Sequence, residues 1–325
     1  MKVLITGGGG FLGYRLARTL LERGTLAAPG GKPAPISRIT LFDTAFPADV
    51  DPRFRTVPGD ISAAGALAAA LDSDTAAVFH LAAVVSGGAE ADFDLGMRVN
   101  FDGTRLLLEA CRALARAPRV VFASSVAAFG GALPAVLSDA TTPTPQTSYG
   151  AQKVIGEYLV TEYSRRGFID GRSLRLPTIV VRPGRPNFAA SSFASAIIRE
   201  PLGGEHCDCP VPDTTGIWLL SPRKAIEAFV HAHELPAPAW ATNRVLNLPG
   251  ISVTVREALA ALADIAGAQT AARVRFKPDA RIQAIVETWP VRFETPRALE
   301  LGFSADPGID AVIGDYIRDQ GIRLA

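Results

Sequence analysis

Short apolar segments alternate with longer helical ones along the first half of the chain. Six runs lack inside–outside alternation, which is typical of strands buried on both faces of a sheet. These runs are Lys2–Thr6, Arg38–Phe42, Arg53–Val57, Ala77–Ala82, Arg119–Ser124 and Leu174–Val181. The predicted helices are Phe11–Arg23, Ala63–Leu71, Ala91–Leu114 and Tyr149–Arg166. Because parallel strands are joined through right-handed crossovers, this order predicts an α/β fold with a doubly wound parallel sheet.

The pattern is less regular from Pro183 onward, where loops are longer and richer in Pro and Gly. Helices are predicted at Ser192–Arg199, Pro222–Leu235 and Ser252–Ala266, the last with Ser252 or Thr254 as its N-cap. We expect a sheet domain over residues 1–182 and a smaller substrate-binding domain over 183–325. The stretch 216–250 could return to the sheet domain. The Pro- and Gly-rich insert Thr25–Ser37 predicts a surface loop.

Composition narrows the class of protein. The 325 residues include 33 Lys and Arg against 32 Asp and Glu, so overall charge gives no reason to expect a nucleic-acid or membrane partner. No segment reaches the roughly 20 apolar residues of a membrane-spanning helix, and no secretory leader is visible. Three cysteines do not make a disulfide framework. These features favour a cytoplasmic protein.

A glycine-rich loop joins the first predicted strand to the first helix. It reads Gly7-Gly8-Gly9-Gly10-Phe11-Leu12-Gly13. Glycine permits the tight turn, close approach of a pyrophosphate to the backbone, and close packing of helix on strand. The N–H groups at the helix start, including those of Phe11 and Leu12, then hold the phosphates. The position of this loop predicts a dinucleotide site lined by Gly7, Gly10 and Gly13.

Residues at the ends of the next strands fit the rest of a dinucleotide. Asp43 ends the second strand, where its carboxylate can accept hydrogen bonds from ribose hydroxyls and repel a 2′-phosphate, which favours NAD over NADP. Asp60 is expected at the adenine amino group and Ile61 at the ring face, with a helix cap as the alternative for Asp60. The small residues after the fourth strand, Leu81-Ala82-Ala83, let the cofactor cross the strand ends, whereas the adjacent His80 is expected to be structural.

Tyr149 and Lys153 carry the predicted chemistry. Their spacing of four places the phenol and the ammonium on one helix face. A free tyrosine, with a pKa near ~10, is a poor base at neutral pH. A nearby ammonium and a positive nicotinamide ring both lower that pKa, so Tyr149 becomes a usable general base. Lys153 would also hold the nicotinamide ribose, and Ser125, at the end of the fifth strand, would hold the substrate oxygen.

This ordered set of residues resembles the extended short-chain dehydrogenases/reductases of the NAD-dependent epimerase/dehydratase type. The resemblance rests on Thr6–Gly13, Asp43, Gly59-Asp60-Ile61, Leu81-Ala82-Ala83, Asn100, Ser125 and Tyr149 with Lys153, and it covers about the first 185 residues. It implies a Rossmann domain with bound NAD, to which Asn100 and Pro177 also contribute. It further implies homodimers that pair through the helices near 91–114 and 149–166.

A closer resemblance covers nearly the whole chain and concerns dehydrogenases of four-carbon sugar acids. It rests on stretches such as Ala82–Gly87, Glu90–Arg98, Pro145–Lys153 and Arg175–Thr178. The resemblance implies oxidation of the 2-hydroxyl of D-erythronate to 2-dehydro-D-erythronate. Its substrate carboxylate needs a cation, for which Arg182, Arg185, Arg199 and Arg223 are candidates. The residues expected to bind the substrate are Ser86, Ser125, Thr178, Arg182, Asn187 and Ser192.

Two other functions stay open. A nucleotide-sugar epimerase would retain its NAD, and a cofactor-sensing protein would keep the fold without catalysis. Phe129-Gly130 stands where nucleotide-sugar enzymes commonly have Tyr-Gly, and Val126-Ala127 replaces the acid pair of dehydratases. The intact Ser125, Tyr149 and Lys153 argue against a sensor. Cys207-Asp208-Cys209 beside His206 is too closely spaced for a full zinc shell, so no metal is expected.

Overall fold

The computed structural model describes residues 1–28, 31–184 and 190–324, and the chain divides into two compact units. The first unit comprises Met1–Ala128, Thr147–Arg175 and Ile226–Asn247. The second comprises Phe129–Gln146, Leu176–Ala225 and Leu248–Ala325. The chain therefore passes between the units several times, and the predicted stretch 216–250 is divided between them.

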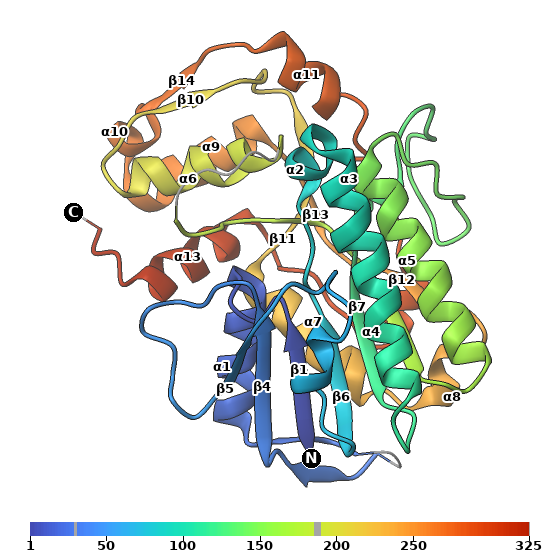
Figure 1. The fold of residues 1–325 in the computed structure, drawn as a ribbon. Helices are drawn as coiled ribbons and strands as arrows, with labels where there is room; N and C mark the ends of the chain where they lie inside the picture. Colours follow the sequence, from blue (N-terminus) through green and yellow to red (C-terminus); the bar gives the residue numbers. More distant parts are fainter. Residues whose placement is uncertain (29–30, 185–189, 325) are drawn as a thin grey trace. The chain divides into compact units, whose positions relative to one another are not determined.

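The first unit is built on a seven-stranded parallel sheet with the strand order β12-β8-β7-β6-β1-β4-β5 (Figure 1). Its strands are β1 (Lys2–Thr6), β4 (Arg38–Asp43), β5 (Arg55–Pro58), β6 (Thr75–His80), β7 (Arg119–Ser125), β8 (Asp170–Leu176) and β12 (Val245–Asn247). Strand β1 pairs with β4 on one side and β6 on the other, both in parallel. The chain order reverses direction at β1, and α/β sheets bind ligands beyond the strand ends at such a point. The predicted fold class is confirmed.

Helices cover both faces of this sheet (Figure 1). The helices of the first unit are α1 (Phe11–Arg23), α2 (Ser86–Ala91), α3 (Phe93–Gly96), α4 (Gly103–Arg112), α5 (Ser148–Arg165), α8 (Ala237–Trp240) and most of α7 (Pro222–Glu234), of which the short α2 and α3 pack against α5. The expected single helix Ala91–Leu114 is wrong in detail, since it is divided into α3, the π-helical segment η2 (Met97–Asp102) and α4. Asp92 has extended backbone, which separates α3 from α2, and its side chain caps α3 by accepting from Leu95 N.

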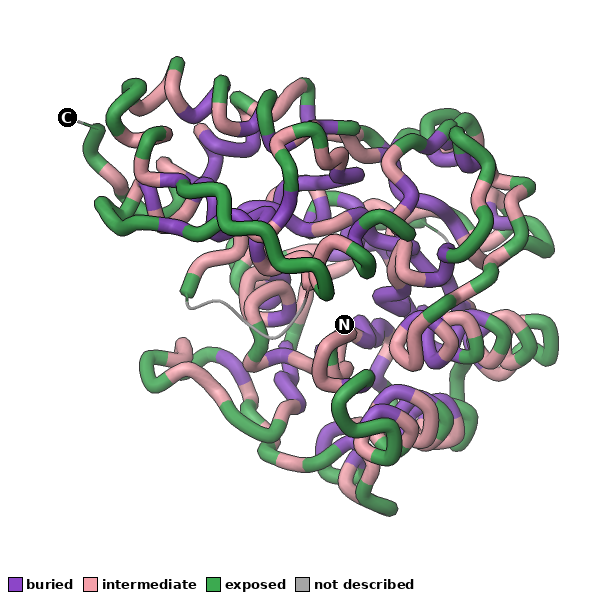
Figure 2. Tube along the Cα trace, turned by 90° about the horizontal axis from the view of Figure 1, so that it is seen from above, coloured by how far each residue is buried: buried purple, intermediate pink, exposed green. Residues whose placement is uncertain are grey.

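The inner strands of the sheet are buried because both of their faces are covered (Figure 2), whereas the edge strand β5, expected to be buried, alternates between half-buried and exposed residues. Leu4 and Val78 pack with Leu107 and Val160 from α4 and α5 in one continuous apolar cluster. Apolar side chains on both faces of a strand explain why the sequence runs lack alternation. The sheet edge that carries the strand ends is thereby held rigidly.

Three local predictions differ from the structure. The insert expected to be a loop contains a two-stranded antiparallel hairpin, β2 (Thr25–Ala27) with β3 (Pro33–Pro35), because Leu26 provides a fully buried anchor. The expected helix Ala63–Leu71 is reduced to the 3₁₀ segment η1 (Ala66–Ala69), whose Leu67 alone is buried. The expected strand Leu174–Val181 is broken at Pro177, which lacks an N–H for a ladder.

The second unit combines small sheets with short helices. Strands β9 (Thr178–Ile179), β11 (Gly216–Leu220) and β13 (Ile251–Thr254) form one sheet, and β10 (Cys207–Cys209) and β14 (Val274–Phe276) form another. The helices are α6 (Ser192–Leu202), α9 (Val255–Ala266), α10 (Ala268–Ala271), α11 (Ala280–Val286), α12 (Pro296–Glu300) and α13 (Ile309–Gln320). The 3₁₀ segment η3 (Val126–Ala128) belongs to the first unit. Helices α6, α9 and α13 enclose the apolar core of the second unit.

The start of α9 decides between the two predicted N-caps. Thr254 accepts from Glu257 N, while the Glu257 carboxylate accepts from Thr254 N, which is a complete capping box. Ser252 instead lies in β13 and pairs with Trp218. Thr254 is therefore the N-cap.

Candidate active site

In the glycine loop after β1, neighbouring backbone atoms occupy the space that side chains would need. A Cβ at Gly7 would lie 2.6 Å from Ala82 N, and a Cβ at Gly13 would lie 2.0 Å from Gly7 O. Gly7 also has a φ of 72°, which favours glycine. Helix α1 begins at Phe11 without a side-chain cap, so N–H groups of its first turn can meet phosphate oxygens. The loop fits the pyrophosphate of a dinucleotide.

Asp43 stands at the end of β4 and is held by backbone groups. Its Oδ2 accepts from Gly9 N at 3.0 Å, and its Oδ1 accepts from Thr44 N at 2.7 Å. Each carboxylate oxygen can accept more than one hydrogen bond, so these contacts orient the group without exhausting it. The arrangement joins the carboxylate directly to the glycine loop, as a ribose-binding acid requires.

Asp60 and Ile61 follow β5 and have local roles in the structure. Asp60 Oδ1 accepts from both the backbone N–H and the hydroxyl of Ser62. These contacts close a turn and do not cap a helix, because the next helical segment, η1, begins at Ala66 with Gly65 as its N-cap. Ile61 is buried against Gly103, where a Cβ would lie 2.7 Å from its side chain. Contact of these residues with an adenine ring stays a prediction.

Asn100 fastens the loop that follows β6. Its Oδ1 accepts from Val84 N at 2.8 Å, and its Nδ2 donates to Val84 O at 3.0 Å and to Gln152 Oε1 at 2.7 Å. Both amide hydrogens are thus used within the protein. Asn100 holds the segment after Leu81, Ala82 and Ala83 against α5, and these three residues are half-buried at the strand end.

His80 has the packed environment that its sequence position predicted. Its Nδ1 lies 2.7 Å from Thr6 Oγ1 and its Nε2 lies 2.9 Å from Thr104 Oγ1. Burial lowers the pKa of His80 to about 3, with a further lowering from the charge of Lys153. A neutral ring with both nitrogens bonded is suited to structure rather than proton transfer.

The structure brings Tyr149 and Lys153 together near the start of α5. Thr147 caps this helix by accepting from Gly150 N, which sets the helix start immediately before the tyrosine. The ammonium of Lys153 lies 5.5 Å from the centre of the Tyr149 ring and donates to Ala123 O at 2.8 Å. Burial lowers the pKa of Lys153 to about 7, whereas the charge of Glu157 acts to raise it.

The two serines that end β7 have different surroundings. Ser124 is buried and donates its hydroxyl hydrogen to Glu157 Oε1 at 2.5 Å. Ser125 is half-buried, and its Oγ accepts from Ala127 N at 3.1 Å, which leaves the hydroxyl hydrogen available. This difference agrees with the choice of Ser125 as the substrate-binding serine.

Ser86, a predicted substrate contact, is half-buried at the start of α2 in the first unit. In the second unit, Thr178 and Ser192, also predicted to bind substrate, are half-buried, and Pro177, predicted to contact the cofactor, is buried. Arg182 is anchored through its N–H to Ser195 Oγ and through Nε to Ile179 O. Asn187 and Arg185 lie outside the described residues.

Two candidate arginines are engaged by carboxylates of the second unit. Arg199 donates to Arg182 O and to Glu200 Oε1, the latter at 2.6 Å. Arg223 donates to Asp315 Oδ2, also at 2.6 Å. These ion pairs would compete with a substrate carboxylate for both guanidinium groups.

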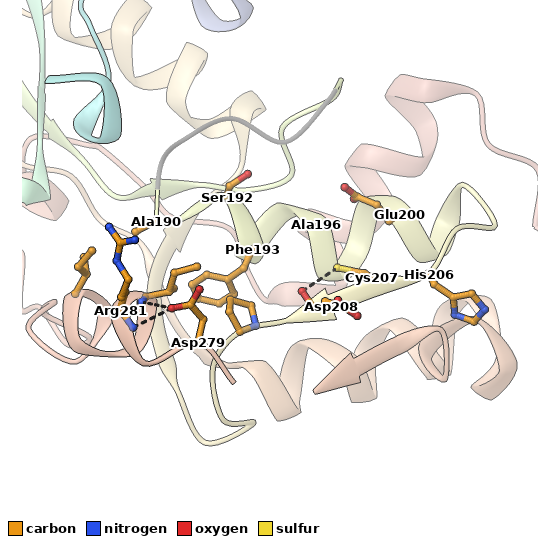
Figure 3. Close-up of a pocket in the computed structure, with 13 residues that line it drawn as sticks. Ala190, Ser192, Phe193, Ala196, Glu200, His206, Cys207, Asp208, Asp279 and Arg281 are labelled. Carbon is orange, nitrogen blue, oxygen red and sulfur yellow. Dashed lines mark hydrogen bonds between the residues drawn. The ribbon is translucent and has the colours of Figure 1, made fainter. Parts of the chain in front are cut away.

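An open cavity of about 720 Å³ lies within the second unit (Figure 3). Ser192, Phe193, His206, Cys207, Asp208 and Arg281 are among the residues that line it. Asp279 faces Arg281 in Figure 3 and caps α11 by accepting from Arg281 N and Ile282 N. Across the described residues 1–28, 31–184 and 190–324, no group of three His, Cys, Asp or Glu side chains could hold a metal ion.

Comparison with known proteins shows the family of the chain. Residues 3–237 match the NAD dependent epimerase/dehydratase family. The chain is 57% identical to D-erythronate dehydrogenase of Cupriavidus necator over 99% of both chains, and 44% identical to D-erythronate dehydrogenase of Haemophilus influenzae over 98% and 99%. A solved structure described as a nucleoside-diphosphate-sugar epimerase from Agrobacterium tumefaciens is 41% identical, with a TM-score of 0.92 over 100% and 96%.

The family match and the two relatives named as dehydrogenases show that the chain is an NAD-dependent oxidoreductase. The chain belongs to the NAD dependent epimerase/dehydratase family, as an extended short-chain dehydrogenase/reductase. No helix in the described part of the chain is long and apolar enough to cross a membrane.

Sequence reasoning missed the buried pair formed by Glu157 and Arg175. Arg175 donates to both carboxylate oxygens of Glu157, at 2.8 and 2.6 Å. The sequence did indicate that Glu157 lies near Lys153, because the two residues are four apart on the same predicted helix. Its partner on β8 is distant in sequence, so only the folded chain reveals the pair.

Proposed function

We propose that this protein oxidises the 2-hydroxyl of D-erythronate to 2-dehydro-D-erythronate with NAD. The observation that carries the proposal is the buried Lys153 ammonium, 5.5 Å from the centre of the Tyr149 ring, in a chain 57% identical to D-erythronate dehydrogenase over nearly its full length. The 44% identical relative, which bears the same name and comes from a different organism, adds support.

In the proposed reaction, Ser125 donates its hydroxyl hydrogen to the substrate oxygen and holds it beside Tyr149. Tyr149 takes the proton from the 2-hydroxyl as the carbonyl forms. Lys153 stabilises the phenolate by its charge and holds the ribose next to the nicotinamide. NAD, when bound, supplies the acceptor for the hydride that leaves C2.

NAD is preferred over NADP in this proposal because of Asp43. Its carboxylate is oriented by Gly9 N and Thr44 N at the end of β4, and a negative charge there repels a 2′-phosphate. The same group accepts hydrogen bonds from the two ribose hydroxyls of NAD. The choice is therefore made by charge as well as by hydrogen bonding.

Arg182 is the proposed partner of the substrate carboxylate. A guanidinium can bind a carboxylate through two parallel hydrogen bonds, and the backbone of Arg182 is fixed by Ser195. Ser86, Thr178, Asn187 and Ser192 are proposed to bind hydroxyls. An Arg182→Met variant is expected to raise KM far more than it lowers kcat.

A homodimer that pairs through α4 and α5 is also proposed. Three large apolar side chains are exposed on the first unit near these helices: Phe93 at 59%, Ile155 at 38% and Tyr158 at 70%. Ile155 and Tyr158 lie three residues apart on α5, so they share one face. Exposed apolar side chains grouped in this way mark interaction surfaces.

A nucleotide-sugar epimerase is the second candidate, favoured by the description of the 41% identical Agrobacterium structure. One experiment separates the two. The purified protein is mixed with NAD and a panel of four- to six-carbon aldonates, and absorbance at 340 nm is followed. Accumulating NADH with D-erythronate supports the dehydrogenase, whereas no NADH with any aldonate and interconversion of a nucleotide sugar would contradict it.

A further inference from the structure

A buried carboxylate lies one helical turn beyond Lys153. The Glu157 side chain is 4% exposed and accepts from Ser124 Oγ at 2.5 Å as well as from two nitrogens of Arg175. Arg175 also donates to Asn247 Oδ1 at 3.3 Å. Burying such ions is costly unless they are paired with good geometry, and this pair is bidentate. The chain therefore retains two charges beneath its catalytic helix.

The carboxylate is fastened to the same strand end that presents the substrate-binding serine. Lys153 donates to Ala123 O, and Glu157 accepts from Ser124, so successive turns of α5 contact successive residues of β7. Between them, a Cβ at Gly156 would lie 2.7 Å from the Phe122 ring, which means that helix and strand are in close contact there. These contacts set the register between α5 and Ser125.

The charge of Glu157 also acts on Lys153. Burial lowers the pKa of the Lys153 ammonium to about 7, and Glu157 opposes that lowering. The other titratable groups around the ammonium are the Tyr149 phenol on α5, the neutral His80 imidazole on β6 and the Arg175 guanidinium on β8. Glu157 is the negative charge in this group, so it is suited to keep the ammonium protonated.

We propose that Glu157 is a positioning residue that acts through Lys153, keeping the ammonium charged and aligned beside Tyr149, and that Arg175 attenuates its charge. The inference rests on the proposed function for the role of Lys153 in proton transfer. Glu157 itself touches neither substrate nor cofactor in this proposal. Its contribution is to the charge state of the residue that makes Tyr149 a base.

The test is a direct titration of Lys153 in the whole protein without substrate or cofactor. The chain contains five lysines, so ¹³C-lysine labelling gives a simple NMR spectrum in which a Lys153→Arg variant identifies one signal by its loss. Glu157→Gln is expected to lower the pKa of Lys153 by about one unit or more, because a nearby opposite charge is lost. Arg175→Met is expected to raise it, because the carboxylate is no longer neutralised.

The opposite signs distinguish this role from a structural one. Both variants break the same ion pair, so mere loosening of α5 would move the pKa of Lys153 in the same direction in both. Shifts of one sign, or no shift in either variant, would overturn the proposal. Glu157→Asp keeps the charge and is expected to return the pKa of Lys153 toward that of the unmodified protein.

A second variant covers the case in which a lone buried charge prevents folding. The double variant Glu157→Gln with Arg175→Met replaces the pair by neutral groups, which proteins often tolerate. It is expected to lower the pKa of Lys153, since the carboxylate is the charge that acts on the ammonium; an unchanged pKa would overturn the proposal. Because the titration uses no substrate, failure to oxidise any sugar acid would refute the proposed function without altering this result.

Discussion

The ammonium of Lys153 lies 5.5 Å from the centre of the Tyr149 ring, and its position is fixed by a 2.8 Å hydrogen bond to Ala123 O. The hydrogen bond to Ala123 O matters because a lysine side chain is otherwise flexible and its ammonium is better solvated in water. A charge held in a buried position acts on a neighbouring phenol more strongly than one in water. Helix α5 and strand β7 therefore together hold the ammonium beside the phenol, as the proposed mechanism requires.

Replacing Tyr149 by Phe is expected to lower kcat at least ~10²-fold, because the general base is removed while the ring remains. NADH formation with D-erythronate measures the loss. Binding of NADH, followed by its fluorescence, is expected to change little, and this serves as the control for intact folding. A variant with normal turnover would show that another group takes the proton.

The sequence predicted the sheet and the proximity of Tyr149 to Lys153 for a physical reason. Buried parallel strands need continuous apolar runs, and a helix spacing of four brings Tyr149 and Lys153 onto one face wherever the helix lies. The glycine loop was equally local, since Gly7 and Gly13 are required by backbone contacts a few residues away or at the adjacent strand. Local rules sufficed for each of these features.

The features that the sequence did not reveal depend on distant partners. Glu157 and Arg175 meet only after β7 and β8 become neighbours. The hairpin of β2 and β3 forms because Leu26 is buried by tertiary packing, although its prolines and glycines favour a loop. The failed helix at Ala63–Leu71 had good helical composition, but its only buried side chains are Leu67 and the small Ala70. Propensity was overridden in both cases.

Changing Asp43 is expected to alter the choice of cofactor. Asp43→Ala removes hydrogen bonds to the ribose hydroxyls and is expected to weaken NAD binding about tenfold or more. Asp43→Asn is the matched control, because its amide oxygen can still accept from Gly9 N while the charge is lost. Both variants should raise kcat/KM for NADP relative to NAD. An unchanged ratio in both would remove Asp43 from the cofactor site.

A methyl group at Gly13 is expected to disrupt the glycine loop. The Cβ of Gly13→Ala would lie 2.0 Å from Gly7 O, so the backbone must shift. We expect a loss of about 1–3 kcal/mol in the free energy of unfolding, with weaker dinucleotide binding. Gly10→Ala is the stability control, since its Cβ would meet Gly7 O at 3.3 Å. Chemical denaturation compares the two, and equal stability would contradict the packing argument.

The proposed dimer can be tested on α5. Tyr158→Glu places a charge on the exposed apolar face that includes Ile155. If that face is the interface, the variant should elute as a monomer with the mass of one 34.2 kDa chain, measured by light scattering after gel filtration. Phe276→Glu, which changes an exposed aromatic residue of the second unit, is expected to leave the mass unchanged. Dimers that persist in Tyr158→Glu would exclude this interface.

Two buried histidines are expected to make stability depend on pH. Burial lowers the pKa of His80 to about 3, and burial together with the charges of Arg119 and Arg172 lowers that of His233 well below its ordinary 6.5. In the unfolded chain both rings bind protons below about pH 6.5, whereas the folded chain keeps them neutral. Stability is therefore complete above that pH and falls as pH decreases toward the folded values.

As pH falls below about 6.5, each of these histidines is expected to lower the free energy of unfolding, with a slope that approaches about 1.4 kcal/mol per pH unit. Urea denaturation between pH 6.5 and pH 5 measures the slope. His233→Leu fills the site beside Phe79 without a titrating group and should reduce the slope by about half. The exposed His206 supplies the control, because His206→Ala should leave the slope as it is. If His233→Leu retains the full slope, protonation of that ring does not limit stability in acid.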